Sequence, residues 1–523
     1  MSYKIEKIES EITNHLSDLV VNYLNNEEFL KPFYQYSPNI NSFKQIVEDR
    51  KKYPVNRKVL VETLKGQYKS ISSKLSLDVL LDENTFTVTT GHQLCLFTGP
   101  IYFIYKIATT INLANQLKKE YPEYNFVPIY WMASEDHDID EIQDLYLNGE
   151  QLDSEISYSG IAGELPTNSL AEFIRKVEQK VKVNKELFEV FKKAYQEQEN
   201  LANATRQIVN ELFGSYGLVV LDGNHKALKQ SFSEIIKDEV LNETSAKLVE
   251  EQSTKLSKKY KTQVNPRAIN LFYLGENRRE RIEKINSFYQ TVDGKFKWEE
   301  KEFLLEINES PQNFSPNVVL RPLYQEAILP NLAYVGGPSE IAYWFQLKKV
   351  FEHHQQFYPA LILRNSSLLI NSSVQRKMEQ LDLKSADLFI SEQELINTFI
   401  ENHHTYSGLE EERGKLNQLF EALLSKANNI DEGLKNFILA QKATSEKALE
   451  NIDKKIVKTL KNQEEVNIER IRVVHQAIFP NGTLQERKMN VMDDTNWLGK
   501  ELIDVLIADL DALDFRLNLI FSS

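Results

Sequence analysis

Two short apolar, β-prone runs, each followed directly by a polar cluster, constrain the fold of this chain more than any other feature. The runs are residues 85–88 (Thr-Phe-Thr-Val) and 126–131 (Phe-Val-Pro-Ile-Tyr-Trp), and a helix-like segment from Ile101 to Lys119 separates them. This order predicts a strand, a loop, a helix and a second strand. Because open α/β sheets bind ligands at the carboxyl ends of their strands, we expect a small-molecule site there.

The first polar cluster contains two glycines, a histidine and several hydroxyl groups. A glycine after a strand allows a tight turn and a close approach of a ligand to the backbone. The N–H groups that open the next helix favour an anion, and a histidine here can stabilise charge in a transition state. The alternative is a plain turn glycine beside a half-buried histidine. The candidate residues are Thr90, Gly91, His92, Gln93, Thr98 and Gly99.

The second polar cluster places three carboxylates and an imidazole within five residues. Carboxylates at this position are suited to holding an ammonium group or Mg²⁺, or to acting as a general base. A zinc site is a competing hypothesis, because a histidine and an aspartate are typical zinc ligands, but the sequence assigns no third ligand. A charged loop that caps a helix is the non-functional alternative. The candidate residues are Ser134, Glu135, Asp136, His137 and Asp138.

A second α/β unit is predicted for residues 315–365. The run 328–335 leads into Gly-Gly-Pro-Ser-Glu at 336–340, which is a second candidate cradle for an anion or carboxylate; a tight connection is the alternative. An arginine directly after the buried run 360–363 can hold a carboxylate or phosphate in a bidentate manner. The candidate binding residues are Arg321, Tyr334, Gly336, Gly337, Glu340 and Arg364.

Several site types lack support. The chain has no Walker A sequence and no Gly-x-Gly-x-x-Gly, so a P-loop or a standard dinucleotide motif is not indicated. Adjacent residues point apart on a helix. The pairs His353-His354 and His403-His404 are therefore not expected to bind a metal, and we predict no metal ligand.

The remaining pattern is largely helical. Residues 1 to about 80 show apolar residues at helical spacing, and no proline occurs between Pro359 and Pro480. That proline-free span carries a heptad seam, which predicts an antiparallel hairpin or a dimerisation coiled coil, with an ordinary helical bundle as the alternative. The seam residues are Leu416, Phe420, Leu423, Ala427, Ile430, Leu434 and Phe437.

These patterns divide the chain into five parts. Residues 1–150 hold N-terminal helices and the first half of an α/β core, and 151–300 form an insertion with a further core strand. Residues 301–375 supply the second half of the core, 376–475 the helical arm, and 476–523 a segment that returns to the core.

Composition narrows the class of protein. The net charge of −14 is unfavourable for nucleic-acid binding, which needs a basic face. No apolar run approaches the roughly 18 residues of a membrane span. The single cysteine, Cys95, excludes an internal disulfide and fits a reducing, cytoplasmic location.

Several blocks of sequence resemble one known family. The chain is similar to the bacillithiol biosynthesis cysteine-adding enzymes, the BshC family, in blocks that span nearly its whole length. The blocks are Thr-Gly-His-Gln…Leu-Phe-Thr-Gly-Pro at 90–100, residues 131–138, 315–322 and 334–344, and Phe-Pro-Asn-Gly-Thr-Leu-Gln-Glu-Arg at 479–487.

The resemblance implies a Rossmann-like core with connecting-peptide insertions, a protruding coiled coil and a homodimer formed through the helical arm. It also implies a reaction, the joining of L-cysteine to the amino group of glucosaminyl-malate in the last step to bacillithiol. Amide formation requires an activated carboxylate, for which ATP with Mg²⁺ is the expected cofactor.

The candidate residues then divide into three roles. Thr90, Gly91, His92 and Gly99 are expected to line a phosphate or acyl-oxyanion site. The carboxylates of residues 135–138 are expected to hold the amino-acid ammonium or serve as base, with His137 beside them. Gly336, Gly337 and Arg364 are expected to face the sugar malate or the nucleotide. Two other hypotheses are a metal-dependent hydrolase that uses the Glu-Asp-His-Asp cluster and a non-catalytic coiled-coil scaffold.

Overall fold

The computed structural model describes residues 3–404, 406, 408–428, 430–431, 433–494 and 499–522. The chain divides into two units, which we call the core unit (residues 1–369 with 483–523) and the arm unit (residues 370–482). Within the described ranges, no helix combines the length and the apolar character needed to cross a membrane.

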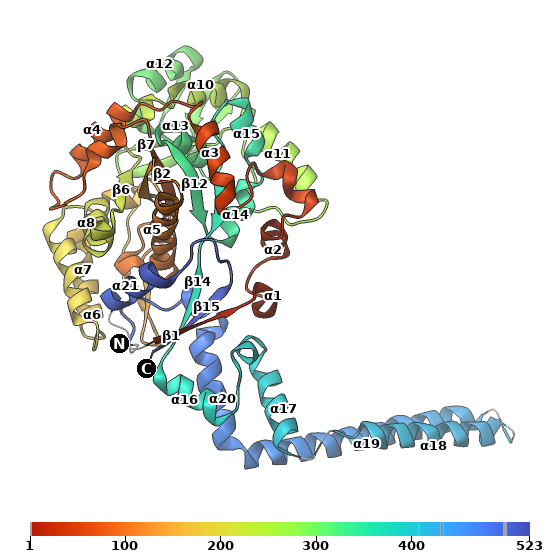
Figure 1. Cartoon of the computed structure of the whole chain (residues 1–523). Helices are drawn as coiled ribbons and strands as arrows, with labels where there is room; N and C mark the ends of the chain where they lie inside the picture. The colour runs from red at the N-terminus through yellow and green to blue at the C-terminus, as the bar shows by residue number, and fades with distance from the viewer. Residues whose placement is uncertain are drawn as a thin grey trace. The chain divides into compact units, whose positions relative to one another are not determined.

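A five-stranded parallel sheet lies at the centre of the core unit (Figure 1). Its strands are β2 (Thr85–His92), β3 (Asn125–Met132), β6 (Val219–Asp222), β12 (Asn331–Gly336) and β13 (Ala360–Leu363). They lie in the order β13-β12-β2-β3-β6. This is the doubly wound order 5-4-1-2-3, in which the winding direction reverses between β2 and β12.

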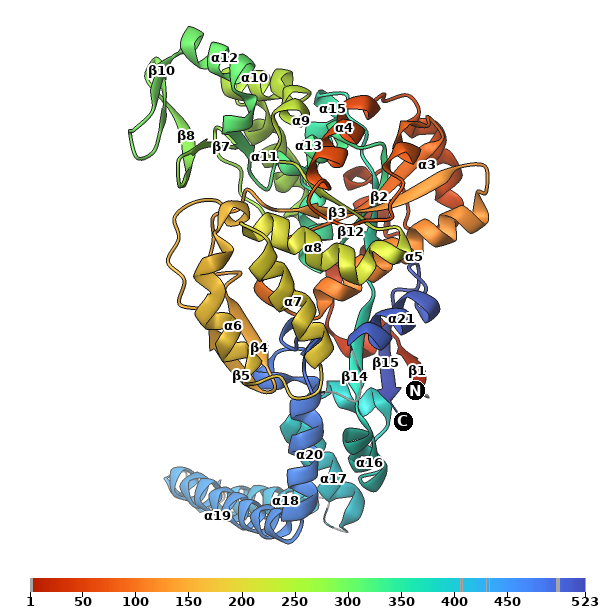
Figure 2. The same ribbon diagram turned by 90° about the vertical axis from the view of Figure 1, so that its left-hand side faces the viewer.

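Helices cover the sheet, so its central strands are buried along almost their whole length. Seen from the edge in Figure 2, α5 and α8 lie on one side, and α3 and α4 on the other. The core-unit helices up to the third sheet strand are α1 (Ser10–Thr13), α2 (Asp18–Leu24), α3 (Phe43–Arg50), α4 (Arg57–Gln67), α5 (Tyr102–Glu120), α6 (Ala171–Glu178), α7 (Lys185–Glu197) and α8 (Leu201–Phe213). Those that follow are α9 (Lys226–Gln230), α10 (Ser233–Asn242), α11 (Thr244–Leu256), α12 (Glu300–Glu309), α13 (Arg321–Ile328), α14 (Pro338–Trp344), α15 (Lys348–His353) and α21 (Gly499–Asp509).

The strand register brings the predicted polar clusters to one edge of the sheet. Gly91 and His92 at the end of β2 pair with Trp131 and Met132 of β3, and Met132 pairs with Asp222 of β6. On the other side, Thr90 of β2 pairs with Val335 of β12. The carboxyl ends of these strands are therefore level with one another.

The insertion between β3 and β12 adds two small antiparallel elements. A hairpin of β4 (Asp144–Leu147) and β5 (Glu150–Asp153) follows the second polar cluster. A five-stranded sheet of order β10-β9-β8-β7-β11 follows α11. Its strands are β7 (Leu271–Gly275), β8 (Arg278–Ile285), β9 (Phe288–Thr291), β10 (Lys297–Glu299) and β11 (Phe314–Pro316).

The helical prediction is wrong for the first residues of the chain. Tyr3–Ile8 form strand β1, which pairs antiparallel with β15 (Leu517–Ser522) at the other end of the chain. With β14 (Ser366–Ile370), these strands make a three-stranded sheet of order β1-β15-β14. The apolar spacing fits a helix, but the partner strand more than 500 residues away supplies the ladder hydrogen bonds and determines the outcome.

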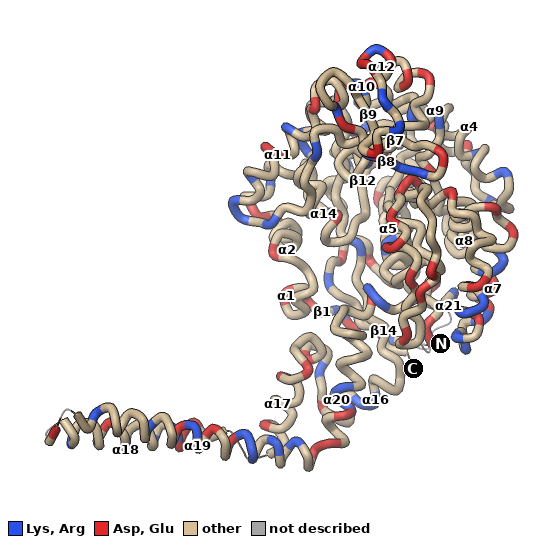
Figure 3. The backbone as a smooth tube through the Cα atoms, turned by 180° about the vertical axis from the view of Figure 1, so that it is seen from behind, with Lys and Arg blue, Asp and Glu red and all other residues tan. Residues whose placement is uncertain are grey.

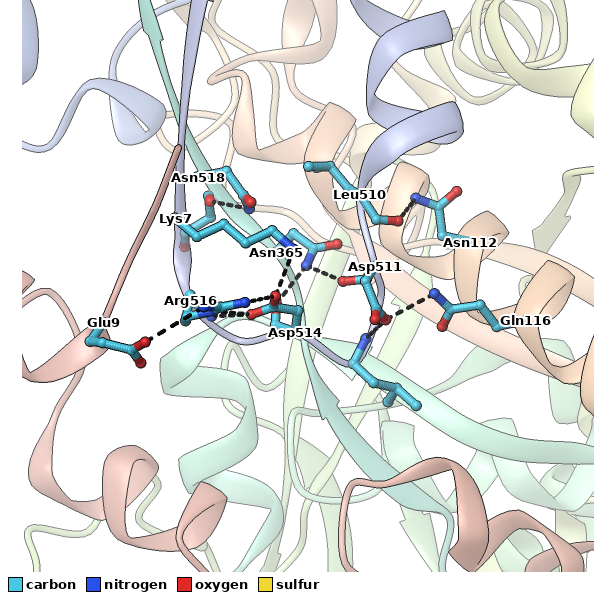
Figure 4. A network of polar contacts seen from close by, with 12 residues as sticks. Lys7, Glu9, Asn112, Gln116, Asn365, Leu510, Asp511, Asp514, Arg516 and Asn518 are labelled. Atoms are coloured by element: carbon cyan, nitrogen blue, oxygen red, sulfur yellow. Dashed lines mark hydrogen bonds and ion pairs between the residues drawn. The ribbon is translucent and has the colours of Figure 1, made fainter. Parts of the chain in front are cut away.

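Polar contacts fasten the C-terminal segment to the core (Figure 4). The side-chain amide of Asn112 on α5 donates to the carbonyls of Leu506 and Leu510, at 2.9 and 2.8 Å. Asn365, between β13 and β14, donates to the carbonyls of Asp511 and Asp514. The last residues of the chain are therefore an integral part of the core unit.

The arm unit consists of helices. α16 (Ser372–Gln380), α17 (Glu392–His403) and α20 (Glu465–Ile478) are its shorter ones, and α18 (Glu410–Asn428) and α19 (Leu434–Gln463) pack as an antiparallel pair. The coiled-coil prediction is confirmed. Lys and Arg alternate with Asp and Glu along α18 and α19 (Figure 3), as expected of a solvated hairpin.

The predicted seam does not run unbroken through this hairpin. α18 ends at Asn428, so Ile430 lies in the turn and Phe437 lies on α19; the two side chains are 78% and 62% exposed. Phe420 and Ala427 are buried. A heptad count cannot register a reversal of chain direction, because the apolar spacing continues across the turn.

Candidate functional site

A cavity of about 490 Å³ opens at the carboxyl edge of the parallel sheet, between β2 and β12. This is the point at which the winding direction reverses, where doubly wound folds bind their ligands. Four cationic side chains and one carboxylate line it. The polar and glycine lining residues are Gly91, His92, Gln93, Tyr102, Lys106, Arg321, Tyr334, Gly337, Ser339, Glu340, Tyr343, Arg364 and Arg487.

A buried ion pair forms the floor of the cavity. Lys106 on α5 is 3% exposed, and its Nζ donates to Glu340 Oε2 at 2.6 Å and to the carbonyl of Gly91. Glu340 also accepts from the backbone N–H of Gly337 at 2.8 Å and from the Tyr334 hydroxyl at 2.5 Å. Although burial favours the neutral acid, the Lys106 charge keeps the pKa of Glu340 below its ordinary value.

The predicted anion cradle at residues 336–340 already has internal partners. The Gly337 N–H donates to the chain's own Glu340, and the Gly336 carbonyl accepts from the Arg364 N–H at 2.9 Å. Gly337 lines the cavity, whereas Gly336 lies in the buried strand. The glycine loop therefore shapes the wall and leaves anion binding to the cationic side chains.

Arg321 is a cationic lining residue with a buried nitrogen that has no hydrogen-bond partner among the described residues. Its Nη1 donates to Gln325 at 3.0 Å, while Nη2 is buried with no hydrogen-bond partner among the described residues. The guanidinium carbon lies 5.8 Å from the ring centre of Trp131 and 5.5 Å from that of Tyr334. A Cβ on Gly91 would lie 3.6 Å from Nη1. The aromatic rings hold the guanidinium beside the β2 backbone and leave donors for an anion.

Arg364 is placed differently, because a carboxylate already neutralises it. Its Nη1 and Nη2 donate to Glu486 at 2.9 and 2.6 Å in a bidentate pair that is almost fully buried. Its guanidinium lies 5.1 Å from the ring centre of Tyr102. Arg364 lines the cavity, but its main partner is the C-terminal segment, so its first role is to join β13 to that segment.

His92 is a neutral imidazole at the mouth of β2. Burial, with a smaller effect of the Lys106 charge, lowers the pKa of His92 to about 4. Its Nδ1 lies 2.9 Å from the Gln93 carbonyl, which can only accept, so Nδ1 carries the proton. Nε2 is then an unprotonated acceptor. Tyr102 and Phe103 pack against the ring, with ring centres 5.3 and 5.2 Å away.

The second polar cluster does not line the cavity. Glu135 pairs with Lys229, whose side chain is 1% exposed and also donates to Asn224 and Gln312. The Ser134 hydroxyl donates to Asp222 at the end of β6. His137 and Asp138 are exposed. The ammonium, base and metal roles predicted for this cluster require free carboxylates, whereas Glu135 is bound to an internal cation and Asp138 is exposed outside the cavity.

Asp136 also has several internal partners. It accepts from the Gln93 amide at 2.8 Å and from the His137 N–H at 2.8 Å, and Arg279 Nη1 lies 3.8 Å away. Burial opposes the charge, yet these hydrogen bonds and the Arg279 charge hold the pKa of Asp136 well below its ordinary value. Gln93 lines the cavity, so Asp136 acts there only by positioning Gln93.

Three residues of the first cluster also lie away from the cavity. The Thr90 hydroxyl donates to the Val335 carbonyl at 2.8 Å, inside the sheet. The Thr98 hydroxyl donates to the Phe97 carbonyl, and the Gly99 carbonyl accepts from Asn490 at 2.7 Å. The oxyanion role predicted for Thr90 and Gly99 is therefore not supported by their positions.

Sequence reasoning missed several lining residues. Lys106 and Tyr102 lie on α5, Ser339 and Tyr343 on α14, and Arg487 follows Glu486 in the C-terminal segment. A lysine at position 106, in an otherwise apolar helical stretch, was the available signal. A buried lysine almost always has a partner.

The sheet order, with a cavity at its reversal point, defines the core unit as a Rossmann-like domain. Residues 3–365 match the family described as "Bacillithiol biosynthesis BshC, N-terminal Rossmann-like domain", and residues 367–522 match "Bacillithiol biosynthesis BshC, C-terminal coiled-coil domain". The chain therefore belongs to the BshC family, and the resemblance drawn from the sequence is confirmed.

Individual relatives agree over nearly the full length. A protein of Flavobacterium psychrophilum named "Putative cysteine ligase BshC" is 42% identical over 519 residues, covering 97% of this chain and 98% of the relative. Relatives of the same name from Flavobacterium johnsoniae and Bacillus cytotoxicus are 39% and 25% identical, covering 98% and 94% of this chain and 99% and 96% of the relatives. A solved structure titled as a putative arginyl-tRNA synthetase from Campylobacter jejuni covers 87% of this chain and 95% of that one. The TM-score is 0.23 at 12% identity, which is too low to indicate a shared fold.

Proposed function

We propose that this protein is a cysteine ligase that joins L-cysteine to the amino group of glucosaminyl-malate, with ATP activating the cysteine carboxylate. The observation that carries the proposal is the cationic cavity at the winding reversal of a BshC core. Lys106 and Arg364 are neutralised by Glu340 and Glu486, whereas Arg321 and Arg487 have no carboxylate within 4.0 Å among the described residues.

Two uncompensated arginines suit the anions of this reaction. Glucosaminyl-malate carries two carboxylates and ATP carries a triphosphate, and guanidinium groups bind both in a bidentate manner. Arg321 has a buried free Nη2, and Arg487 adds an exposed charge at the cavity. We assign anion binding to these two residues.

The chemistry balances in two steps. The cysteine carboxylate attacks ATP either at the γ-phosphorus, which displaces ADP and gives an acyl phosphate, or at the α-phosphorus, which displaces pyrophosphate and gives an acyl adenylate. The sugar amine then attacks the carbonyl carbon, loses one proton and expels the phosphate or nucleotide. His92 Nε2, unprotonated at neutral pH, is the lining group suited to accept that proton.

The cavity lining offers few protein ligands for Mg²⁺. Glu340 is the single carboxylate among the lining residues, and it already binds Lys106, Tyr334 and the Gly337 N–H. The lining therefore does not fit a protein-held Mg²⁺. We assign no step to a protein-bound magnesium ion.

A mass-spectrometric assay tests the proposal. Purified protein is incubated with cysteine, glucosaminyl-malate, ATP and Mg²⁺, with each component omitted in turn. The expected product is one water lighter than the sum of the two substrates and requires ATP, and the nucleotide released identifies the activated intermediate. Product formed without ATP would overturn the activation step. No product from folded protein in the complete mixture would overturn the ligase assignment.

We also propose that the protein is a cytoplasmic homodimer that associates through α18 and α19. Leu423, Leu434 and Phe437 are exposed apolar residues on these helices, and the cost of leaving them in water favours a partner. Light scattering of the wild type should give twice the monomer mass of 60.7 kDa. A monomer mass at micromolar concentration would exclude the dimer.

A further inference from the structure

Two histidines and an aspartate converge on the core unit, outside the cavity. Asp238 lies on α10, and His353 and His354 lie at the end of α15. Asp238 Oδ2 is 3.4 Å from His353 Nε2 and 3.7 Å from His354 Nε2. The three atoms all lie within 4.8 Å of one another, and no other such group occurs among the described residues.

The sequence argument against this histidine pair fails at the helix end. Adjacent residues point apart within a helix, but α15 ends at His353 and His354 is its C-cap. Gln355, the next residue, has a φ of 51°, so the chain turns sharply out of the helix. The two rings lie 4.8 Å apart at 89° to each other, and both Nε2 atoms face Asp238.

Two of the three convergent atoms have unused hydrogen-bonding capacity. Asp238 Oδ2 and His354 Nε2 are both buried and have no hydrogen-bond partner among the described residues. The His354 side chain is only 7% exposed. Asp238 Oδ1 accepts from Asn242 at 2.8 Å, which orients Oδ2 toward the histidines. Leaving a buried polar atom without a partner is unfavourable, so two such atoms aimed at one point indicate a ligand.

We propose that Asp238, His353 and His354 bind one divalent transition-metal ion of the zinc class, with water as the fourth ligand. Zinc bonds of about 2.0–2.1 Å in a tetrahedron place ligand atoms roughly 3.3–3.4 Å apart, close to the distances from Asp238 Oδ2. His353 is 46% exposed, which leaves solvent access for the water. The ion would tie α10 of the insertion to α15, the helix that leads into β13 and Arg364.

Zinc binding by the untagged, full-length protein tests this site. After chelator treatment and dialysis, calorimetric titration with Zn²⁺ and elemental analysis should give one ion per chain. Co²⁺ should give the visible absorption of a tetrahedral nitrogen–oxygen site. Zn²⁺ should also raise the melting temperature of the wild type.

Two variants and one control decide the outcome. Asp238→Asn and His353→Ala should each weaken zinc affinity at least tenfold and abolish the rise in melting temperature. His403→Ala, which changes the other histidine pair, should bind like the wild type. The site is refuted if wild-type protein takes up no zinc, or if His353→Ala binds zinc as tightly as the control. None of these readouts depends on ligase activity.

Discussion

Two regions along the carboxyl edge of the parallel sheet both carry polar and charged side chains, but they differ in whether those side chains already have internal partners. After β3, residues 134–138 carry three carboxylates, yet Lys229 binds Glu135, and Gln93 and Arg279 contact Asp136. At β2 and β12, Arg321 keeps a buried nitrogen free and His92 keeps an unprotonated Nε2.

The comparison teaches that charge density is a poor guide to a ligand site. Both regions follow buried strands, and both satisfy the rule that ligands bind at strand ends. The region at the winding reversal lines a cavity in which Arg321 keeps a buried nitrogen without a hydrogen-bond partner among the described residues. Substitutions in the carboxylate cluster should therefore lower stability, whereas substitutions in the cavity should lower activity.

The largest effect is expected from Lys229→Met. The substitution leaves the Glu135 carboxylate without its buried cation, which should lower the free energy of unfolding by about 3–5 kcal/mol. Urea denaturation measures this, and the double variant Lys229→Met/Glu135→Gln should recover part of the loss. A cost below about 1 kcal/mol would mean that the pair is not structural.

Arg321→Met should act on the reaction instead. We expect kcat/KM to fall roughly 100- to 1,000-fold, equivalent to about 2.7–4 kcal/mol of transition-state stabilisation, because an anion loses its bidentate partner. The free energy of unfolding should change little. Arg278→Met is the matched control and should keep full activity. It removes an arginine that lies on β8 and pairs with Asp293. Equal losses in both variants would argue against a specific role for Arg321.

His92→Gln should lower kcat about 100-fold, as removal of a general base does. In protein labelled with ¹⁵N-histidine, the His92 signal should show the neutral Nδ1–H form from pH 5 to 8, because its pKa lies near 4. The variant spectrum identifies the signal. A midpoint near pH 6.5 would contradict the buried, neutral state.

Asp136→Asn should cost about 1–2 kcal/mol of stability at pH 7, through weakened hydrogen bonds to a charged group, and only a few-fold in kcat/KM. The pKa of Asp136 is lower in the folded than in the unfolded chain, so its charge stabilises the fold above about pH 4. The difference between wild type and variant should therefore shrink as the pH falls below 4. A hundredfold loss of activity would show that Asp136 takes part in the reaction.

The smallest effect is expected from Cys95→Ser. Burial raises the pKa of the Cys95 thiol to about 12, so almost no thiolate exists at neutral pH. Activity should stay close to that of the wild type, and iodoacetamide at pH 7.5 should not inactivate the enzyme. Rapid inactivation by alkylation in the wild type, absent in the variant, would show an accessible and reactive thiol.

The sequence predicts local elements of this fold better than it predicts partners. The strand at 85–92, the helix that begins near Tyr102 and the helical arm follow from propensity and periodicity. β1 was missed because its ladder partner, β15, lies at the far end of the chain. Local windows cannot register such a pairing.

The same limit applies to the site. His92, Gly91 and Arg321 are recognisable from strand ends and residue chemistry, and they line the cavity. Nothing local shows that Lys229 neutralises Glu135, or that Glu486 neutralises Arg364, because these partners are 94 and 122 residues apart. Whether a charged side chain has an internal partner depends on the tertiary structure, and this difference distinguishes the carboxylate cluster from the cavity.

The discontinuous core unit has a consequence for protein synthesis. Glu486 follows Arg364 by 122 residues, and β15 is the last strand of the chain. At about 5–20 residues per second, the ribosome needs roughly 6–24 s to make the intervening arm. During that interval Arg364 has no counter-ion and β14 has no β15 to pair with. The cavity wall is therefore completed only after Glu486 and β15 have been synthesised, so a chain that stops before Glu486 has no finished site.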